Sequence, residues 1–337
     1  MIANGSCGQQ VLVAGGAGFI GSHLVDRLLA AGAQVVVLDN LQTGRKVNLS
    51  HLRGTSGLTF VKGDIIDKLP GEITRRRFDR IYNLACAASP PHYQEDPEHT
   101  MLTNVLGTRN LLRLAEAQGA RFLLTSTSEV YGDPESHPQR EDYRGWVSCT
   151  GPRACYDEGK RAAETLTFDF ARAGRADVRV VRIFNTYGPR MDPEDGRVVS
   201  NVICQALSGK PITIYGDGSQ TRSFCYVDDL VDGILSLMAF EGEQPGPVNL
   251  GNPNELTVCD LVDRVVALTG TQSGVVYEQL PQDDPRRRRP DISLARQLLS
   301  WEPKIELQQG LEATTAYFTE QLRLRPSAGE RTLAAAE

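Results

Sequence analysis

Residues 10–21 read QVLVAGGAGFIG, a short apolar run that leads directly into a glycine-rich turn. The apolar part, residues 10–14, has the character of a buried strand, and a helical pattern of leucines follows the turn. Gly15, Gly18 and Gly21 give the spacing Gly-x-x-Gly-x-x-Gly. A strand, a glycine turn and a helix in this order place free backbone N–H groups at the positive end of the helix, where a pyrophosphate can dock. The sequence therefore predicts a dinucleotide-binding site at this turn.

A carboxylate follows the second predicted strand, residues 34–38, at Asp39. This is the distance from the glycine turn at which an acidic residue binds the adenosine ribose. A carboxylate in that place repels the 2′-phosphate of NADP. The sequence therefore favours NAD as the cofactor, although the basic residues Arg45 and Lys46 follow.

Predicted strands and helices alternate through the first half of the chain. Further strands are expected over residues 58–62, 80–84, 121–125 and 178–182, and helices over about 100–118 and from about 154. This order is typical of the α/β class. It predicts a doubly wound parallel sheet of the Rossmann type.

Turn-forming glycines and prolines become frequent after Asn185. We therefore expect residues 1–184 to form the NAD-binding domain and residues 185–325 to form mainly a smaller, C-terminal lobe that binds the substrate. The chain is expected to return to the first domain at about residues 225–250. Residues 326–337 are expected to form a frayed tail.

The composition is that of a globular protein without a membrane span. Apolar residues make up 40% of the 337 positions, and no apolar run approaches the roughly 18 residues that a spanning helix needs. The net charge of −6 argues against a nucleic-acid-binding surface, and the N-terminus lacks a signal-peptide pattern, so we expect a cytoplasmic protein. Seven cysteines and five histidines show no metal-ligand spacing, which predicts reduced thiols and no bound metal.

The stretch YDEGK, residues 156–160, places Tyr156 and Lys160 four positions apart, on one face of the predicted helix. A nearby ammonium group favours the phenolate, so Lys160 is expected to lower the tyrosine pKa from about 10. Such a phenol can take a proton from a sugar hydroxyl while hydride leaves the same carbon. On its own, a Tyr-x-x-x-Lys pair is more often solvated surface.

A second group of polar residues supports a catalytic role for Tyr156 and Lys160. The strand over residues 121–125 runs directly into Ser126, Thr127, Ser128 and Glu129. Ligands collect at the carboxyl ends of the strands of a parallel sheet, so these side chains are expected to face the nicotinamide. The alternatives are backbone capping for the hydroxyls and a solvated loop charge for the carboxylate.

Long motifs give a more specific indication. They are TSEVYGDP at residues 127–134, GPRACYDEGKR at 151–161 and RIFNTYGPR at 182–190, extended by DGRVVSN at 195–201, GSQTR at 218–222 and NLGNP at 249–253. With these motifs the chain resembles the extended short-chain dehydrogenase/reductases, and more narrowly the UDP-glucuronate decarboxylases (UDP-xylose synthases). The resemblance covers roughly residues 9–322.

The resemblance implies a role for individual residues. Thr127 and Tyr156 would hold the C4 hydroxyl of the sugar, Tyr156 would take its proton, and Lys160 would bind the nicotinamide ribose. Ser128 and Glu129 complete the expected catalytic group. Cofactor contacts are implied for Gly15, Gly18, Phe19, Ile20, Gly21, Asp39, Asn40, Thr43, Gly44, Asp64, Ile65, Leu84, Thr103, Tyr156, Lys160, Thr186 and Arg197. Substrate contacts are implied for Tyr93, Asn110, Asn185, Tyr215, Arg222 and Arg288. The family also implies a homodimer, paired through helices at about 100–118 and 154–174.

The implied reaction is an NAD-dependent conversion of UDP-glucuronate to UDP-xylose. Oxidation at C4 creates a β-keto acid, CO₂ leaves, C5 is protonated and hydride returns to C4. Ser128 is a poor acid, which disfavours the sister dehydration, and Glu129 disfavours a 4-epimerase. Release of the 4-keto pentose with NADH, UDP-glucuronate 4-epimerisation and a non-catalytic NAD-binding regulator remain alternatives.

Three positions need separate comment. Arg288 lies in DDPRRRRPD, residues 283–291, which could also be a solvated charge run; we expect it to orient the substrate carboxylate or diphosphate. Cys86 stands where a serine is common in the family. Asp192 stands where a histidine or similar residue is more usual beside the cofactor.

Overall fold

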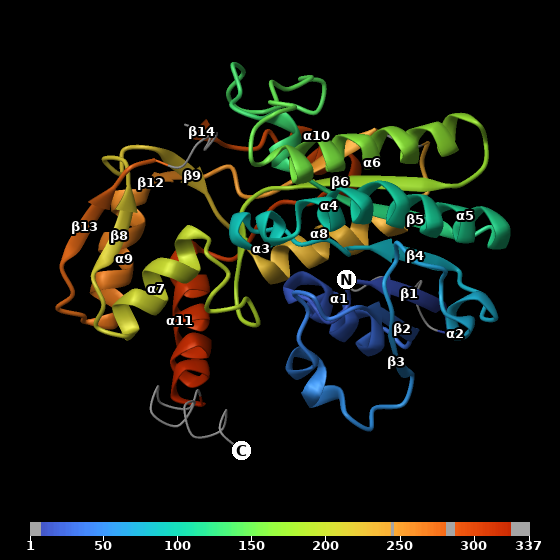
Figure 1. Cartoon of the computed structure of the whole chain (residues 1–337), viewed down its shortest axis with the longest axis horizontal. Coiled ribbons are helices and arrows are strands. Elements are labelled where there is room, and N and C mark those ends of the chain that lie inside the picture. Colours follow the sequence, from blue (N-terminus) through green and yellow to red (C-terminus); the bar gives the residue numbers. More distant parts are fainter. Residues whose placement is uncertain (1–7, 244–245, 281–286, 325–337) are drawn as a thin grey trace.

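The structure, a computed structural model, describes residues 8–243, 246–280 and 287–324. The tail predicted over residues 326–337 lies outside these ranges. A central sheet dominates the larger part of the molecule (Figure 1). Its strands are β1 (Gln10–Ala14), β2 (Gln34–Asp39), β3 (Leu58–Lys62), β4 (Arg80–Asn83), β5 (Arg121–Thr127), β6 (Val178–Ile183) and β11 (Pro247–Leu250).

All neighbouring strands of this sheet are parallel, in the order β11-β6-β5-β4-β1-β2-β3. The order reverses direction at β1, as in a doubly wound sheet. The predicted fold class is therefore confirmed. The last strand, β11, joins the sheet from far along the chain and pairs with β6 from Pro247 opposite Val180 to Leu250 opposite Ile183.

The helices complete the fold. They are α1 (Phe19–Ala30), α2 (Gly71–Thr74), α3 (Pro90–Glu95), α4 (Pro97–Leu102), α5 (Thr108–Gln118), α6 (Ala154–Arg172), α7 (Val198–Leu207), α8 (Val227–Ala239), α9 (Val258–Thr269), α10 (Ser293–Leu299) and α11 (Leu307–Leu324). Two 3₁₀ turns cover Lys46–Leu52 and Ser128–Tyr131. The helix predicted over about 100–118 is divided by a π-helical turn at Thr103–Gly107, between α4 and α5.

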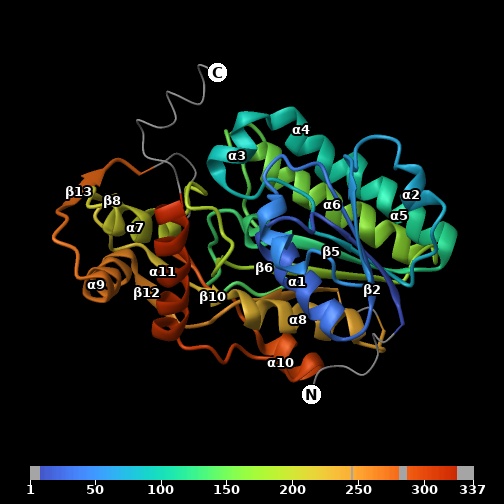
Figure 2. The same ribbon diagram turned by 90° about the horizontal axis from the view of Figure 1, so that it is seen from below.

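Alternate residues of the central strands enter two different cores. Val11 and Val13 of β1 pack with α1 and α8, whereas Leu12 and Ala14 pack with residues of α5 and α6. Figure 2 shows α1, α8 and α10 on one side of the sheet and α4, α5 and α6 on the other. A strand buried on both faces needs the continuous apolar run that β1 carries.

The C-terminal lobe consists of small sheets and three helices. Its strands are β7 (Thr186–Tyr187), β8 (Ile212–Tyr215), β9 (Thr221–Ser223), β10 (Cys225–Tyr226), β12 (Glu255–Thr257), β13 (Val275–Glu278) and β14 (Arg287–Arg288). They pair as β10-β7, β12-β9-β14 and β13-β8. Helices α7, α9 and α11 pack beside them, and their buried residues are continuous with the core formed by α1 and α8. The lobe therefore shares with the sheet the core on the α1 and α8 side, and not the core on the α5 and α6 side.

A buried ion pair ties the sheet to α6. The Nε and Nη2 atoms of Arg182, in β6, lie 2.9 and 2.8 Å from the two carboxylate oxygens of Glu164, in α6. Ser126 of β5 donates a hydrogen bond of 2.5 Å to the same carboxylate, and Arg182 also donates to the hydroxyl of Tyr131. These bonds fix the register of α6 against the carboxyl ends of β5 and β6.

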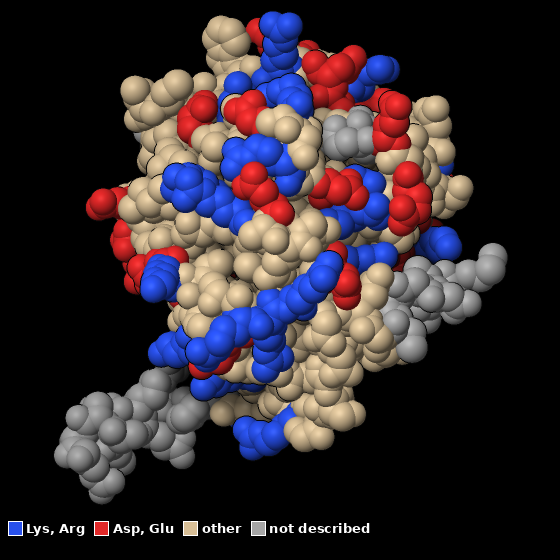
Figure 3. Space-filling model, turned by 90° about the vertical axis from the view of Figure 1, so that its right-hand side faces the viewer, with Lys and Arg blue, Asp and Glu red and all other residues tan. Residues whose placement is uncertain are grey.

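The surface carries both signs of charge. Basic and acidic side chains are intermixed over much of the face that Figure 3 shows, in keeping with 36 basic and 42 acidic residues in the sequence. Of the helices that the structure describes, none combines the length and the apolar character needed to cross a membrane. Cys86, Cys149, Cys155, Cys225 and Cys259 are free thiols.

Candidate active site

A cavity of about 750 Å³ lies at the carboxyl ends of the sheet strands, between the sheet and the C-terminal lobe. All but one of the site residues predicted from the sequence line it. They are Gly15, Gly18, Phe19, Ile20, Gly21, Asp39, Asn40, Thr43, Gly44, Asp64, Ile65, Leu84, Tyr93, Thr103, Thr127, Ser128, Glu129, Tyr156, Lys160, Asn185, Thr186, Arg197, Tyr215, Arg222 and Arg288. The position agrees with the rule that ligands bind outside the carboxyl ends of parallel strands.

Asn110 is the exception, and the structure corrects its assignment as a substrate contact. Its side-chain amide donates to the backbone oxygens of Ile65 at 2.8 Å and of Ile66 and Asp67 at 3.3 Å. It is not among the residues that line the cavity. Asn110 therefore holds the loop after β3 against α5, a structural role that sequence spacing does not distinguish from ligand binding.

The glycine turn fits a pyrophosphate. A Cβ atom on Gly15, whose φ is +79°, would lie 2.7 Å from the carbonyl carbon of Leu84, and one on Gly21 would lie 2.1 Å from the oxygen of Gly15. At Gly18 the only close neighbour would be that same oxygen, at 3.2 Å, so the turn leaves its cavity side open. No side chain caps the start of α1, whose first N–H groups thus stay available to an anion.

Asp39 is buried at the end of β2 and is held by backbone donors. Its Oδ1 accepts from the N–H of Leu41 at 2.8 Å and its Oδ2 from that of Ala17 at 2.9 Å. Burial raises the pKa of Asp39, and these two hydrogen bonds oppose the rise. Each carboxylate oxygen can accept a second bond. The residue is therefore in place for a ribose hydroxyl.

The neighbourhood of Asp39 is polar as well. Asp64 accepts from the amide of Asn40 at 2.6 Å and contacts the imidazole of His99 at 2.8 Å. Although burial opposes ionisation, bonds from Ile66, Asn40 and His99 lower the pKa of Asp64. His99 was not predicted as part of the site. Because it lies 35 positions from Asp64, only the fold brings the two together.

Tyr156 and Lys160 lie in the first turns of α6, as predicted, and both side chains are buried. The ammonium group of Lys160 lies 5.8 Å from the centroid of the Tyr156 ring and donates to the backbone oxygen of Thr125 at 2.9 Å. Burial raises the pKa of Tyr156, against the lowering effect of a hydrogen bond with Thr127 and of the charge of Arg197. The net lowering expected from Lys160 is therefore not found, because burial outweighs the lowering by Thr127 and Arg197.

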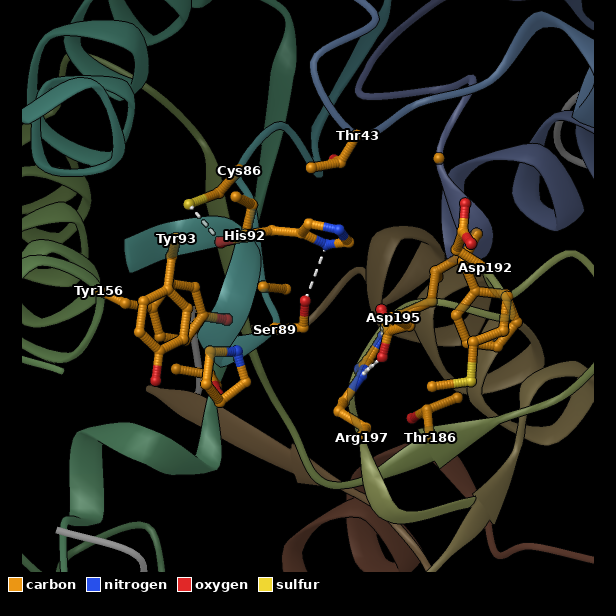
Figure 4. Close-up of a pocket in the computed structure, with 18 of the residues that line it drawn as sticks. Thr43, Cys86, Ser89, His92, Tyr93, Tyr156, Thr186, Asp192, Asp195 and Arg197 are labelled. Carbon is orange, nitrogen blue, oxygen red and sulfur yellow. Dashed lines mark hydrogen bonds and ion pairs between the residues drawn. The ribbon is translucent and has the colours of Figure 1, made fainter. Parts of the chain in front are cut away.

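Tyr93 stacks on Tyr156. The two ring centroids are 5.0 Å apart and the ring planes differ by 5° (Figure 4). The Tyr93 hydroxyl is buried and has no hydrogen-bond partner among the described residues. An aromatic neighbour stacked in this way restricts the orientation of the Tyr156 ring.

Glu129 is the centre of a buried charge cluster. Its carboxylate is bonded by both terminal nitrogens of Arg288, one of them at 3.0 Å, and by Nη2 of Arg153 at 2.9 Å. Burial opposes ionisation, but the charges of Arg288 and Arg153 outweigh it and lower the pKa of Glu129 to about 2. The two arginines thus favour the carboxylate form of Glu129 at neutral pH.

Arg153 is a residue that the sequence reasoning missed. It lies inside the motif at residues 151–161, three positions before Tyr156, but no role was assigned to it. Its position just before α6 was the available signal, because a buried cation next to a predicted catalytic helix needs a carboxylate partner. That partner, Glu129, comes from the 3₁₀ turn that follows β5.

Asp157 lies beside this cluster and behaves differently from Glu129. Burial raises the pKa of Asp157 to about 7, with a further contribution from the charge of Glu129 and an opposing one from Arg153. One of its carboxylate oxygens is buried without a hydrogen-bond partner in the described part of the chain. The ionised form of Asp157 is therefore unfavourable in the folded protein.

This arrangement predicts a pH-dependent effect of Asp157→Asn on stability. An acid whose pKa is higher in the folded than in the unfolded state reduces stability as the pH rises between the two values, here from 3.8 to about 7. The variant should match the wild type at pH 4 and be more stable at pH 8, with a difference that grows by about 1.4 kcal/mol per pH unit up to about pH 7 and is constant above it. Calorimetric melting at pH 4, 6 and 8 measures this. A difference that is constant across this range would contradict it.

Within the described residues, no group of three or more potential ligands could hold a metal ion. The glycine turn, the carboxylate after β2 and the Tyr156–Lys160 pair together define a dinucleotide-binding protein of the Rossmann class with a reactive tyrosine at the sheet edge. A profile of the NAD dependent epimerase/dehydratase family matches residues 11–251. The chain belongs to this family.

Individual relatives show which members of this family the chain resembles. The chain is 52% identical over 315 residues to UDP-glucuronic acid decarboxylase 2 of Arabidopsis thaliana, covering 94% of this chain and 69% of that protein. It is 51% identical over 314 residues to UDP-glucuronic acid decarboxylase 1 of Danio rerio, covering 93% and 73%. UDP-glucuronic acid 4-epimerase from Bacillus cereus, solved with UDP-glucuronic acid and NAD, superposes with a TM-score of 0.84 at 28% identity, covering 93% and 99%. The resemblance inferred from the motifs is confirmed.

Proposed function

We propose that the protein converts UDP-glucuronate to UDP-xylose and CO₂ with NAD as a tightly held cofactor. The observation that carries the proposal is one cavity that joins the glycine turn, the Thr127–Tyr156–Lys160 group and the Glu129–Arg153–Arg288 cluster. Relatives at about half identity are UDP-glucuronic acid decarboxylases, whereas the 4-epimerase is 28% identical. Both comparisons favour decarboxylation over epimerisation.

The reaction begins when the protein removes the proton of the C4 hydroxyl group. Tyr156 accepts it at Oη, while the Thr127 hydroxyl, hydrogen-bonded to Tyr156, holds the two oxygens in line. Lys160 is anchored to Thr125 and places a positive charge near the Tyr156 ring, which favours the phenolate that accepts this proton. When bound, NAD would supply the acceptor for the C4 hydride and the source of the hydride that C4 regains.

The second group of residues acts on the keto acid that C4 oxidation creates. The C5–C6 bond breaks, its electrons enter the C4 carbonyl system, and CO₂ leaves. Arg288 has its charge balanced by Glu129, so it can orient the substrate carboxylate without holding it so firmly that CO₂ loss is retarded. Glu129, whose pKa is lowered by the two arginines, is suited to orient a water molecule that protonates C5.

One assay tests this function. Purified protein is incubated with UDP-glucuronate and NAD, and the products are separated and identified by their mass. UDP-xylose and CO₂ without accumulation of NADH are expected. NADH formed in equal amount with a 4-keto pentose would replace the proposal with the oxidative decarboxylase, and UDP-galacturonate that retains all its carbon would replace it with the 4-epimerase. Bound NAD without turnover would identify a regulator.

We further propose a homodimer formed through α5 and α6. These helices pack against each other on one face of the sheet, and Leu106, in the turn before α5, is 37% exposed. We expect the second subunit to cover the outer faces of these two helices together with Leu106. A native mass of one chain in solution would contradict the proposal.

A further inference from the structure

The sequence carries two opposing signals at the adenosine end of the cavity. In dinucleotide sites a carboxylate after the second strand binds the ribose of NAD, and a nearby arginine accommodates the 2′-phosphate of NADP. This chain has Asp39 in the first position and also Arg45 and Lys46 a few residues later. The contacts that Arg45 and Lys46 make show whether either side chain is available to bind a 2′-phosphate.

Arg45 is fixed close to Asp39 by its backbone. The N–H of Arg45 donates to the oxygen of Ala17 at 2.9 Å, and the N–H of Ala17 donates to Asp39 Oδ2 at 2.9 Å. Gly44 packs on the same carboxylate, because a Cβ there would lie 2.6 Å from Asp39 Oδ1. Arg45 also lines the cavity. The backbone of Arg45 therefore lies beside the Asp39 carboxylate, which would bind the ribose.

The side chain of Arg45 is bound by residues from beyond the sheet. Its Nη1 lies 3.2 Å from Oδ2 of Asp192, in the loop that precedes α7, and its Nη2 donates to the hydroxyl of Tyr317, in α11, at 3.2 Å. Asp192 lines the cavity as well (Figure 4). Lys46 is also engaged elsewhere, with its ammonium group 5.4 Å from the centroid of the Phe60 ring. Both cations thus have partners that are not the nucleotide.

We propose that Asp192 is a cofactor-specificity residue, which neutralises Arg45 and, with Tyr317, keeps it from binding a 2′-phosphate. A 2′-phosphate carries close to two negative charges at neutral pH. It would meet the carboxylates of Asp39 and Asp192, and the guanidinium group of Arg45 would already be paired with Asp192. With Asp192 removed, the same guanidinium group could form charge-assisted bonds to the phosphate. The ion pair is partly exposed, so its rearrangement is not prevented by burial.

This inference rests on the NAD-binding part of the proposed function and is independent of the sugar nucleotide. It is tested with purified protein equilibrated with defined mixtures of NAD and NADP. Free nucleotide is removed by gel filtration, the protein is denatured, and the two released nucleotides are quantified. Asp192→Asn keeps the side-chain shape but removes its charge. The variant should carry about tenfold more NADP relative to NAD than the wild type does.

Matched variants separate this effect from a general change of charge. Asp263→Asn removes one negative charge from an exposed position on α9, outside the cavity, and should leave the nucleotide ratio unchanged. The double variant Arg45→Met/Asp192→Asn should lose the gain in NADP, because the guanidinium group is gone. The shift should also diminish in high salt, which screens partly exposed charges.

An unchanged ratio in Asp192→Asn, with NAD still carried by every variant, would overturn the inference alone. A shift that persists in Arg45→Met/Asp192→Asn would overturn it too, because Arg45 would then not be the group that binds the phosphate. Wild-type protein that carried neither nucleotide would overturn the NAD assignment together with the inference.

Discussion

Tyr156→Phe should lower the turnover of UDP-glucuronate by about 10²- to 10⁴-fold, the range associated with loss of a positioned acid–base group. The phenylalanine ring keeps the stacking contact with Tyr93 but lacks the hydroxyl group that forms the hydrogen bond with Thr127. Because Lys160 and the glycine turn are unchanged, NAD should still bind. Release of CO₂ measures turnover, and the nucleotide carried by the purified variant measures cofactor binding.

A second tyrosine provides the control for this experiment. Tyr277, in β13, is 63% exposed and does not line the cavity, so Tyr277→Phe removes a hydroxyl of the same kind far from the chemistry. Its turnover should equal that of the wild type. Undiminished release of CO₂ by Tyr156→Phe would refute the proposed role of Tyr156 in catalysis.

Arg182→Leu should reduce the free energy of unfolding by about 3–5 kcal/mol, because it leaves the carboxylate of Glu164 buried without its main counter-ion. The two side chains are only 12% and 8% exposed, and each guanidinium bond to Glu164 has good length. Ser126 alone cannot balance the charge. Urea unfolding curves of the variant and the wild type, followed by circular dichroism, give the difference.

The double variant Arg182→Leu/Glu164→Leu distinguishes loss of the ion pair from loss of packing. With both charged groups replaced by apolar side chains, no unpaired charge stays buried, and much of the lost stability should return. If the double variant is as unstable as Arg182→Leu, packing around Arg182, and not the orphaned carboxylate, accounts for the effect.

Local spacing was enough to predict most of the fold and most of the cavity lining. The glycine turn, Asp39 and the Tyr156–Lys160 pair each depend on residues close in sequence, and regular strand and helix geometry carries such spacing directly into space. Asn110 shows the limit of this reasoning, since a polar residue on a correct helix can serve the backbone of a neighbouring loop instead of a ligand. The domain boundaries at residues 184 and 185 stay a prediction.

Contacts between distant segments could not be predicted in the same way. Glu129 and Arg288 are 159 positions apart, and nothing in either local motif indicates that they pair. The pKa of Tyr156 likewise depends on burial by the whole fold, which reversed the direction expected from Lys160 alone. Such properties belong to the assembled core and not to any one motif.

Strand β11 has a consequence for how the chain is made. Its residues, Pro247–Leu250, are the last of the large sheet to be synthesised, yet they form the ladder beside β6. Until they leave the ribosome, β6 presents an open row of backbone N–H and C=O groups to other chains. Nascent or prematurely terminated chains that end before Pro247 are therefore the forms most exposed to aggregation, and a chaperone that shields this edge during translation would be of greatest benefit to them.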